Sequence, residues 1–281
     1  MCRQTHLRKL LMVLAKYVVI GPPRNPCSRF GIYLGMRDKH AFTDPPWTGA
    51  TIACRGAFAT KVVPLRSQEN NPKSSTEPEV SATENLMRQH GVIRRALLVY
   101  RESAAVLRAN APVDPAALYQ TAQLFRRFGE HYHERMLEET FIFPILRILG
   151  GRAGKYPDVL EAQHRRGREI NDYILRVAKR AKSGLGKIGA GQIEPLAVAM
   201  EWLSRMYEHH AAREETIVFP VWKSTMTARQ LDEMSDMFED IEHREFGKDG
   251  FEEAEKTMDG IEVKLGLSDL SRFTALPPPR V

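Results

Sequence analysis

The 281-residue sequence has only three cysteines, and none lies beyond residue 54. Cys2, Cys27 and Cys54 all belong to the first 80 residues. The rest of the chain can therefore form neither a disulfide framework nor a thiolate metal site. Any metal bound there must be held by nitrogen and oxygen ligands.

The sequence is also poor in strand patterns and long apolar runs. After residue 80 apolar residues recur at steps of three and four, which is typical of helices. The apolar run Leu10–Ile20 is interrupted by Lys16 and is too short for a membrane span. It resembles a signal segment, but no clean small-residue cleavage site follows. We expect a cytoplasmic protein, with export as the alternative if Leu10–Ile20 acts as a signal.

Most of the chain carries no excess of positive charge. The net charge is +6, and residues 1–80 alone hold about 12 Lys and Arg against about 5 Asp and Glu. Binding to nucleic acid needs clustered cations, so we expect no nucleic-acid partner for residues 81–281. Residues 1–80 are rich in Pro, Gly and Ser without a sustained period, which predicts a basic, disordered extension.

Residues 81–223 contain four amphipathic stretches joined by short polar turns. A capping box, Ser81–Glu84, opens the first stretch. Asp114 and Pro115 fit the cap and first position of the second, which Gly150–Gly151 should close. The third and fourth begin near Pro157 and Glu194. This pattern predicts an all-α fold, an antiparallel four-helix bundle.

Residues 224–281 predict additional C-terminal helices and a Pro-rich tail. One helix should open at Thr227–Gln230, and another should run from Gly250 to about Leu265. Their apolar stripes should pack on the outside of the bundle. We also consider a protein partner bound through these helices.

Two stretches of the bundle repeat one another. Residues 131–147 read HYHERMLEETFIFPILR and residues 207–223 read YEHHAAREETIVFPVWK, so that both contain EExxxFP. A second element, QHxxxR, precedes each copy, at residues 89–94 and 163–168. The recurrence predicts two half-sites in one bundle.

Helical spacing assigns six inward ligands to these half-sites. Residues four apart share a helix face, as do His210 with Glu214 and Glu134 with Glu138. The two upstream histidines complete the predicted metal ligands, which are His90, Glu134, Glu138, His164, His210 and Glu214. Glu138 and Glu214 are the natural bridges. Buried carboxylates without a cation would be costly, and imidazole with carboxylate suits iron, with manganese as the alternative.

Several neighbours of these ligands leave the assignment open. His131, His133 and His209 flank them, and one could replace Glu134, because a helix face is assigned only to within one residue. A bundle that uses its histidines without metal is the competing reading.

Three further side chains lie beside the predicted site. Tyr207 precedes His210 by one turn and could donate a hydrogen bond to a ligand or bound gas. Arg94 and Arg168 either pair with glutamates at the edge of the site or are solvated. Proline in each EExxxFP block should bend the helix beyond its glutamate.

These blocks resemble the hemerythrin-like, HHE-type cation-binding domain over about Glu84–Lys223. The resemblance implies a non-haem centre of two iron ions, held by a His from helices one and three and by HxxxE from helices two and four. Carried onto this sequence, it implicates His90, Glu138, His164, His210 and Glu214.

The sequence departs from that pattern at two positions. Glu134 stands where the family has His, and Arg168 stands where hemerythrin has a second His on helix three. A carboxylate-rich site should hold harder, more oxidised iron, which disfavours simple reversible oxygen carriage.

The resemblance implies a binding protein rather than an enzyme, one that binds or senses oxygen, nitric oxide or the iron and redox state. The alternatives are iron storage or donation, repair of iron centres under nitrosative stress, and a di-iron oxidase of ferroxidase or peroxidase type.

Overall fold

The computed structural model describes residues 80–184, 187–247 and 250–279. The predicted disordered extension and the signal-like run Leu10–Ile20 lie outside these residues. All regular structure in the described part is helical. Its elements are α2 (Ala82–Arg108), α3 (Pro115–Leu124), η1 (Phe125–Ile142), α4 (Phe143–Leu149), η2 (Ala153–Lys155), α5 (Tyr156–Ser183), η3 (Ala190–Gln192), α6 (Ile193–Arg213), η4 (Glu214–Val218), α7 (Phe219–Ser224), α8 (Ala228–Phe246), α9 (Gly250–Leu265) and η5 (Leu270–Phe273).

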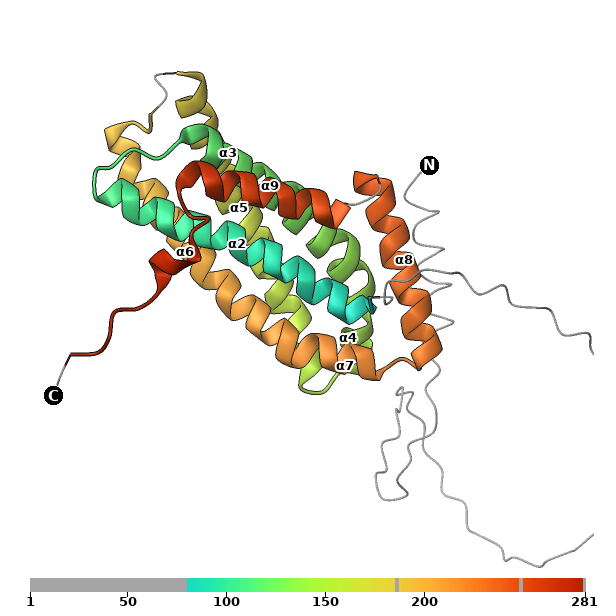
Figure 1. Ribbon diagram of the computed structural model, residues 1–281. Coiled ribbons are helices and arrows are strands. Elements are labelled where there is room, and N and C mark those ends of the chain that lie inside the picture. Colours follow the sequence, from blue (N-terminus) through green and yellow to red (C-terminus); the bar gives the residue numbers. More distant parts are fainter. Residues whose placement is uncertain (1–79, 185–186, 248–249, 280–281) are drawn as a thin grey trace, which may run out of the picture. The chain divides into compact units, whose positions relative to one another are not determined.

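Four long rods form the bundle: α2, the run α3–η1–α4, α5, and the run α6–η4–α7 (Figure 1). Arg94 on α2 pairs with Glu215, just beyond α6. Arg108, at the other end of α2, pairs with Glu194 at the start of α6. These pairs make α2 and α6 antiparallel. The predicted all-α antiparallel bundle is confirmed.

Local signals set where the rods begin and end. The Ser81 hydroxyl accepts a hydrogen bond from the Glu84 amide at 3.3 Å, and the Asp114 carboxylate accepts one from the Ala116 amide at 2.8 Å. Each satisfies an amide that has no partner within its helix. Gly150 and Gly151 follow α4 with φ angles of 68° and 64°. That left-handed region is open to glycine at little cost, so the chain turns sharply there.

The second and fourth rods widen into π-helix at the repeated blocks. The amide of Phe143 donates to the carbonyl of Glu138, and the amide of Phe219 donates to that of Glu214. Each bond spans five residues instead of four. Pro144 and Pro220 follow, and neither has an amide to donate. The wide turns therefore lie at the two glutamates that the sequence predicts as bridges.

Helices α8 and α9 pack on the bundle (Figure 1). Phe238 on α8 is fully buried and stacks on Trp222 of α7, with ring centroids 5.9 Å apart. Arg95 on α2 donates to Glu262 on α9 at 2.9 Å. Helix α9 thus runs beside α2 and α3, whereas α8 contacts the end of the bundle where α2 starts.

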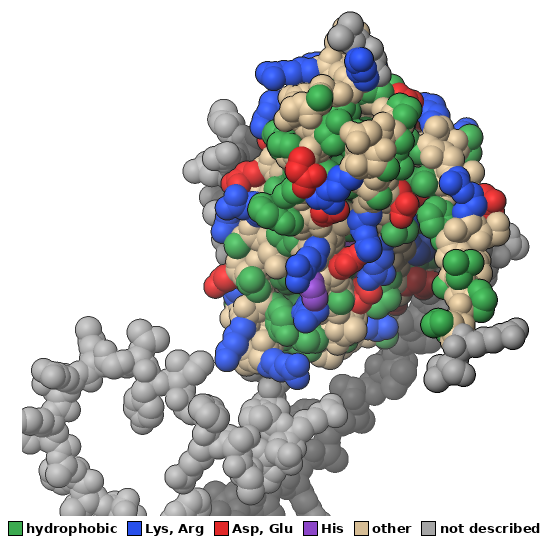
Figure 2. Space-filling model, turned by 90° about the vertical axis from the view of Figure 1, so that its left-hand side faces the viewer, with side chains coloured by type: hydrophobic (Ala, Val, Ile, Leu, Met, Phe, Trp, Pro, Cys, Tyr) green, Lys and Arg blue, Asp and Glu red, His purple; other side chains and the backbone are tan. Residues whose placement is uncertain are grey.

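The surface mixes charges of both signs. In Figure 2, Lys and Arg side chains are interspersed with Asp and Glu on the face shown. Ion pairs between rods, such as Arg147 with Asp158, are part of this pattern.

No helix among the described residues is both long and apolar enough to cross a membrane.

Replacement of Phe238 tests the attachment of α8. Phe238→Ala should lower the free energy of unfolding by about 3–5 kcal/mol, because it removes a fully buried ring. Phe273→Ala, at a ring that is 48% exposed, is the matched control and should change it by less than about 0.5 kcal/mol. Urea unfolding of the full chain measures both. Equal, small effects would contradict the packing of α8 on the bundle.

Candidate metal centre

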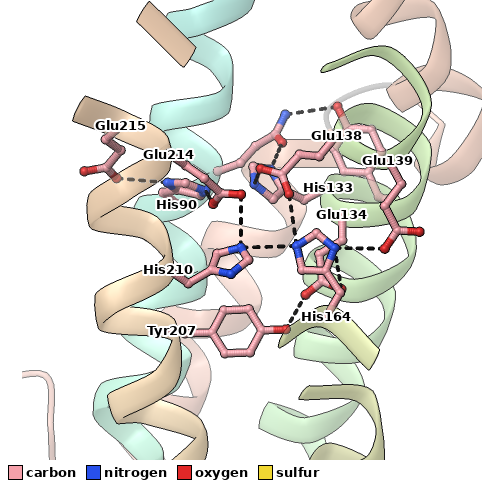
Figure 3. A network of polar contacts seen from close by, with 12 residues as sticks. His90, His133, Glu134, Glu138, Glu139, His164, Tyr207, His210, Glu214 and Glu215 are labelled. Carbon is pink, nitrogen blue, oxygen red and sulfur yellow. Dashed lines mark hydrogen bonds and ion pairs between the residues drawn. The ribbon is translucent and has the colours of Figure 1, made fainter. Parts of the chain in front are cut away.

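Four imidazole rings point into the middle of the bundle, one from each rod. They belong to His90 on α2, His133 on η1, His164 on α5 and His210 on α6 (Figure 3). None is more than 3% exposed. The bundle thus brings together residues that are separated by up to 120 positions in the sequence.

Two fully buried carboxylates, from Glu138 and Glu214, lie between these rings. The oxygens of Glu138 are 3.1 Å from Nε2 of His133 and 3.3 Å from Nε2 of His164. The oxygens of Glu214 are 3.0 Å from Nε2 of His210 and 3.6 Å from Nε2 of His90. Each carboxylate therefore spans two imidazoles of different rods.

Every ring nitrogen on the outer side has an oxygen partner. Nδ1 of His90 lies 2.9 Å from Glu215, and Nδ1 of His164 lies 2.8 Å from Glu139. For the other two rings the partner is a glutamine: the Nδ1–oxygen pairs are His133 with Gln89 at 2.7 Å and His210 with Gln163 at 2.9 Å. Because these oxygens accept, Nδ1 carries the proton, and a neutral ring directs its Nε2 lone pair inward.

The phenylalanine of each EExxxFP block packs against the histidine of a QHxxxR element. Phe143 stacks on His164 with ring centroids 5.6 Å apart, and Phe219 lies 5.3 Å from His90. Both phenylalanines are fully buried. They keep water away from the rings, which strengthens every electrostatic interaction in the cluster.

Most inner atoms of this cluster have no hydrogen-bond partner, although Nε2 of His164 lies 3.1 Å from Nε2 of His210. Both oxygens of Glu138 and of Glu214 have no hydrogen-bond partner among the described residues, and neither does Nε2 of His133. Its 3.1 Å separation from Glu138 is an ion-pair distance without hydrogen-bond geometry. Buried acceptors that face one another are costly unless a cation lies between them. The residues therefore fit a bound metal cation.

The ionisation of the metal-free cluster also fits a site for a metal cation. Burial lowers the pKa of His90 to about 4 and that of His210 to about 3, so both rings are neutral near pH 7. Burial, together with the charge of Glu138, raises the pKa of Glu214 well above its usual range. Burial opposes the charge of Glu138 as well, but His133 and His164 outweigh it and lower the pKa of that carboxyl. Protons thus hold places that a metal ion could take.

Two groups of potential ligand atoms share one residue. Glu138, His164, His210 and Glu214 form the first group, and His90, His133 and Glu138 form the second. The atoms of each group lie within 4.8 Å of one another. Glu138 belongs to both, which is the position of a bridging carboxylate.

Glu134, predicted as an inward ligand beside Glu138, instead contacts Tyr207 and Arg168, and His133, one of the histidines left open there, lies against Glu138. The prediction of Glu134 assumed α-helical spacing, in which residues four apart share a face. The π-helix η1 instead aligns residues five apart, so His133 takes the place that His210 has in the second copy. Four imidazoles and two carboxylates therefore face the middle of the bundle, instead of the His-poorer set expected with Glu134.

Glu134 is buried beside the cluster with other partners. Its carboxylate accepts hydrogen bonds from the Tyr207 hydroxyl and, at 3.0 Å, from Arg168. It also lies near His164, with which it and Glu139 form a third potential ligand group. Tyr207, which the sequence suggested as a donor to a bound gas, is thus engaged by Glu134.

The predicted edge arginines pair with glutamates in both halves. Arg94 donates to Glu215 at 2.7 Å and Arg168 donates to Glu139 at 3.1 Å. These two glutamates are also the Nδ1 partners of the upstream histidines. The second Glu of each EE pair and the Gln of each QH pair belong to the repeat, but the sequence did not reveal that they orient the rings.

Two flanking histidines lie outside the cluster. The side chain of His131 is 52% exposed and lies 3.4 Å from Glu245 on α8. His209 is exposed and contacts Arg213. Neither can reach the inner carboxylates, so His133 alone among the three flanking histidines joins them.

Comparison with known proteins agrees with the cluster. The hemerythrin HHE cation binding domain matches residues 81–222, which include all four buried histidines and both inner glutamates. The chain belongs to the hemerythrin HHE cation-binding family. The predicted resemblance is confirmed, and with it a helical domain that binds metal cations.

Relatives of this hemerythrin-type chain occur in mycobacteria. Uncharacterized protein Rv1995 of Mycobacterium tuberculosis and uncharacterized protein Mb2018 of Mycobacterium bovis are each 40% identical to it over 230 residues. The match covers 80% of this chain and 84% of each relative. It is longer than the HHE domain, so the likeness extends beyond the bundle. No solved structure matches the chain significantly.

Gly167 tests the packing around Tyr207. A Cβ at Gly167 would overlap the Tyr207 hydroxyl, whereas a Cβ at Gly91 would meet nothing within 4 Å. Gly167→Ala should therefore destabilise the metal-free protein by about 1–3 kcal/mol. Gly91→Ala should stabilise it by about 0.5–1 kcal/mol, because alanine favours helix. Thermal unfolding compares the two, and equal stabilisation would contradict the close approach of Tyr207 to α5.

Metal uptake by the cluster should release protons. The pKa values of Glu214, His133 and His164 are raised, so these groups hold protons that a cation must displace. Affinity for Mn²⁺ should rise as the pH increases from about 6.5, the ordinary imidazole pKa, by about tenfold per pH unit for each displaced proton. Calorimetry in buffers of different ionisation enthalpy counts the protons. An affinity independent of pH would argue against binding at this cluster.

Proposed function

We propose that this hemerythrin-type chain binds two iron ions and uses them to bind or sense oxygen or nitric oxide. The ligands would be the four buried imidazoles and the two inner carboxylates: His90, His133, His164, His210, Glu138 and Glu214. Glu138 and Glu214 would bridge the ions. The sharing of Glu138 between two ligand groups supports two metal positions rather than one.

The donor set favours iron. Nitrogen and carboxylate oxygen with no thiolate suit iron or manganese, and six donors for two ions leave open positions for an exogenous ligand. A closed tetrahedral zinc site would need four protein ligands to one ion. Manganese remains the second candidate metal.

The size of the adjacent cavity is the observation that carries the choice of ligand. A space of about 10 Å³ lies against His210, Glu214 and Tyr207. It is close to the smallest space that holds one water molecule. Ile93, Leu97 and Ala211 form the apolar part of its lining. A space of this size excludes organic substrates, so it supports a very small exogenous ligand, for which we propose a diatomic gas.

Gas titration tests the proposal. Protein loaded anaerobically with Fe²⁺ should bind about two iron ions per chain and change its visible absorption on addition of oxygen or nitric oxide. Ala211→Val narrows the cavity without replacing a predicted ligand, and it should retain the iron but slow the change in absorption. Iron-loaded protein that reacts with neither gas would contradict gas binding.

The same preparation separates the alternatives. Transfer of its iron to an apo iron–sulfur protein would indicate iron donation or the repair of iron centres. Multiple turnovers with Fe²⁺ or peroxide would indicate an oxidase. Stable iron without either activity is the result expected for a binding or sensing protein.

Paired variants test the ligand set. His133→Ala should lower metal affinity by more than about 100-fold, beyond the range for partners of ligands. Glu134→Gln should retain the full metal content, because the carboxylate of Glu134 is held by Tyr207 and Arg168. His209→Ala is the surface control. Metal lost in Glu134→Gln but kept in His133→Ala would reverse the assignment.

A further inference from the structure

A polar chain leads from the metal cluster to the C-terminal helices. It begins at Gln89, which is fully buried on α2. The Gln89 carbonyl oxygen accepts from Nδ1 of His133 at 2.7 Å. Its amide nitrogen donates to the Tyr132 hydroxyl at 3.1 Å and to Asn85 at 3.1 Å. The orientation of one amide thus joins a predicted metal ligand to Tyr132.

Tyr132 continues this chain to α8. Its hydroxyl is buried and donates to the carboxylate of Glu242 at 3.0 Å. Burial raises the pKa of Tyr132 well above its usual range, so the hydroxyl keeps its proton. Glu242 is 9% exposed. It lies beyond residue 222, where the HHE match ends, so the series of hydrogen bonds here extends past the family domain.

The other oxygen of Glu242 holds the start of α9. It accepts from the backbone amide of Phe251 at 2.7 Å. Gly250 permits this approach, because a Cβ there would lie 3.0 Å from Cγ of Glu242 and 2.8 Å from Cβ of Phe246. The first turn of α9 is therefore anchored on a carboxylate that also accepts from Tyr132.

Among the residues that the structure describes, the second half of the bundle shows no such extension. Gln163 holds Nδ1 of His210 as Gln89 holds that of His133. However, the residue before His210 is the exposed His209, whereas the residue before His133 is the buried Tyr132. Only one of the two related glutamines is thus connected to the helices that follow the HHE domain.

Buried apolar side chains and ion pairs both hold α9 on the bundle. Ala254, Met258 and Ile261 are at most 7% exposed. Arg95 on α2 binds Glu262, and the Arg88 guanidinium lies over the Phe251 ring, 4.2 Å from its centroid. Between α3 and α9 a groove of about 320 Å³ remains, lined by residues that include Gln120 and Glu253. The groove adjoins Gly250, Glu253 and Thr257 on α9. The bond to Glu242 therefore acts on the first turn of α9, beside this groove, rather than on the whole helix.

We propose that Gln89, Tyr132 and Glu242 form a positioning relay through which metal at His133 and the docking of α9 on the bundle stabilise one another. The inference rests on the proposed metal site. Metal fixes the His133 ring, the ring fixes the Gln89 amide, and the amide and Tyr132 hydroxyl together orient the Glu242 carboxylate toward Phe251. Coupling of this kind is reciprocal, so a change in α9 alters metal affinity by the same factor.

Hydrogen exchange of the full chain tests the relay. The metal-free protein is compared with protein saturated with Mn²⁺, and separately with Fe²⁺ under anaerobic conditions. Exchange in the first turn of α9 should slow by about fivefold or more on loading, the lower range of coupling between sites. In Tyr132→Phe and Glu242→Gln, saturating metal should still bind but the slowing should disappear.

The two glutamines provide the matched control. Gln89→Leu and Gln163→Leu each remove the outer partner of one imidazole, so both should weaken metal binding by about 10–100-fold. At saturating metal, only Gln89→Leu should abolish the response of α9. A response lost equally in both variants would indicate a general effect of metal on the bundle and would overturn the relay.

The remaining outcomes separate the relay from the metal site. Wild-type protein that binds metal without any change in α9 overturns the relay and leaves the site intact. Wild-type protein that binds no metal overturns the proposed function itself. If Tyr132→Phe does not fold, as judged by circular dichroism, the Glu242→Gln variant and the wild-type comparison still show whether the relay exists.

Discussion

The arrangement of the centre depends on one electrostatic constraint: acceptor atoms face one another where water does not reach. Four imidazole nitrogens and the oxygens of Glu138 and Glu214 share the middle of the bundle. Leaving such groups without a cation costs several kcal/mol per ion, even after the protein relaxes. A bound metal would remove that cost. Without metal, the buried groups reduce it by binding protons.

The second layer of the cluster follows from this constraint. An imidazole is a metal ligand only in the tautomer that leaves its inward nitrogen unprotonated. The Nδ1 partners enforce that tautomer on all four rings, through glutamates on two and glutamines on the others. Arg94 and Arg168 in turn hold the glutamates. The pairing of Gln with His and of Glu with Glu in each repeat therefore has a physical basis, which is the orientation of four imidazole rings with Nε2 toward the middle of the bundle.

Much of the fold could be predicted from the sequence because its signals are local. Ser81, Asp114 and Thr227 cap helices, and apolar residues recur with the helical period. Five of the six inward residues followed from the repeat and from the family resemblance. The sixth, His133, was only one of three histidines left open, because a π-helix adds one residue between His133 and Glu138 and the α-helical period does not anticipate that residue.

The C-terminal helices give this hemerythrin-type chain a feature beyond its family domain. The HHE match ends at residue 222, yet Glu242 and Phe251 continue the hydrogen bonds that begin at a buried imidazole. The mycobacterial relatives resemble the chain over a longer stretch than the domain. A hydrogen-bonded path from the proposed ligand His133 to an outer helix is suited to report metal occupancy to the surface of the bundle.

Anomalous diffraction from crystals of the iron-loaded protein, measured on both sides of the iron absorption edge, tests the central claim most directly. The account predicts two peaks inside the bundle, both adjoining Glu138, with the His133 ring bound to one of them. A single peak, or a peak bound by Glu134 while His133 stands away from it, would contradict the account.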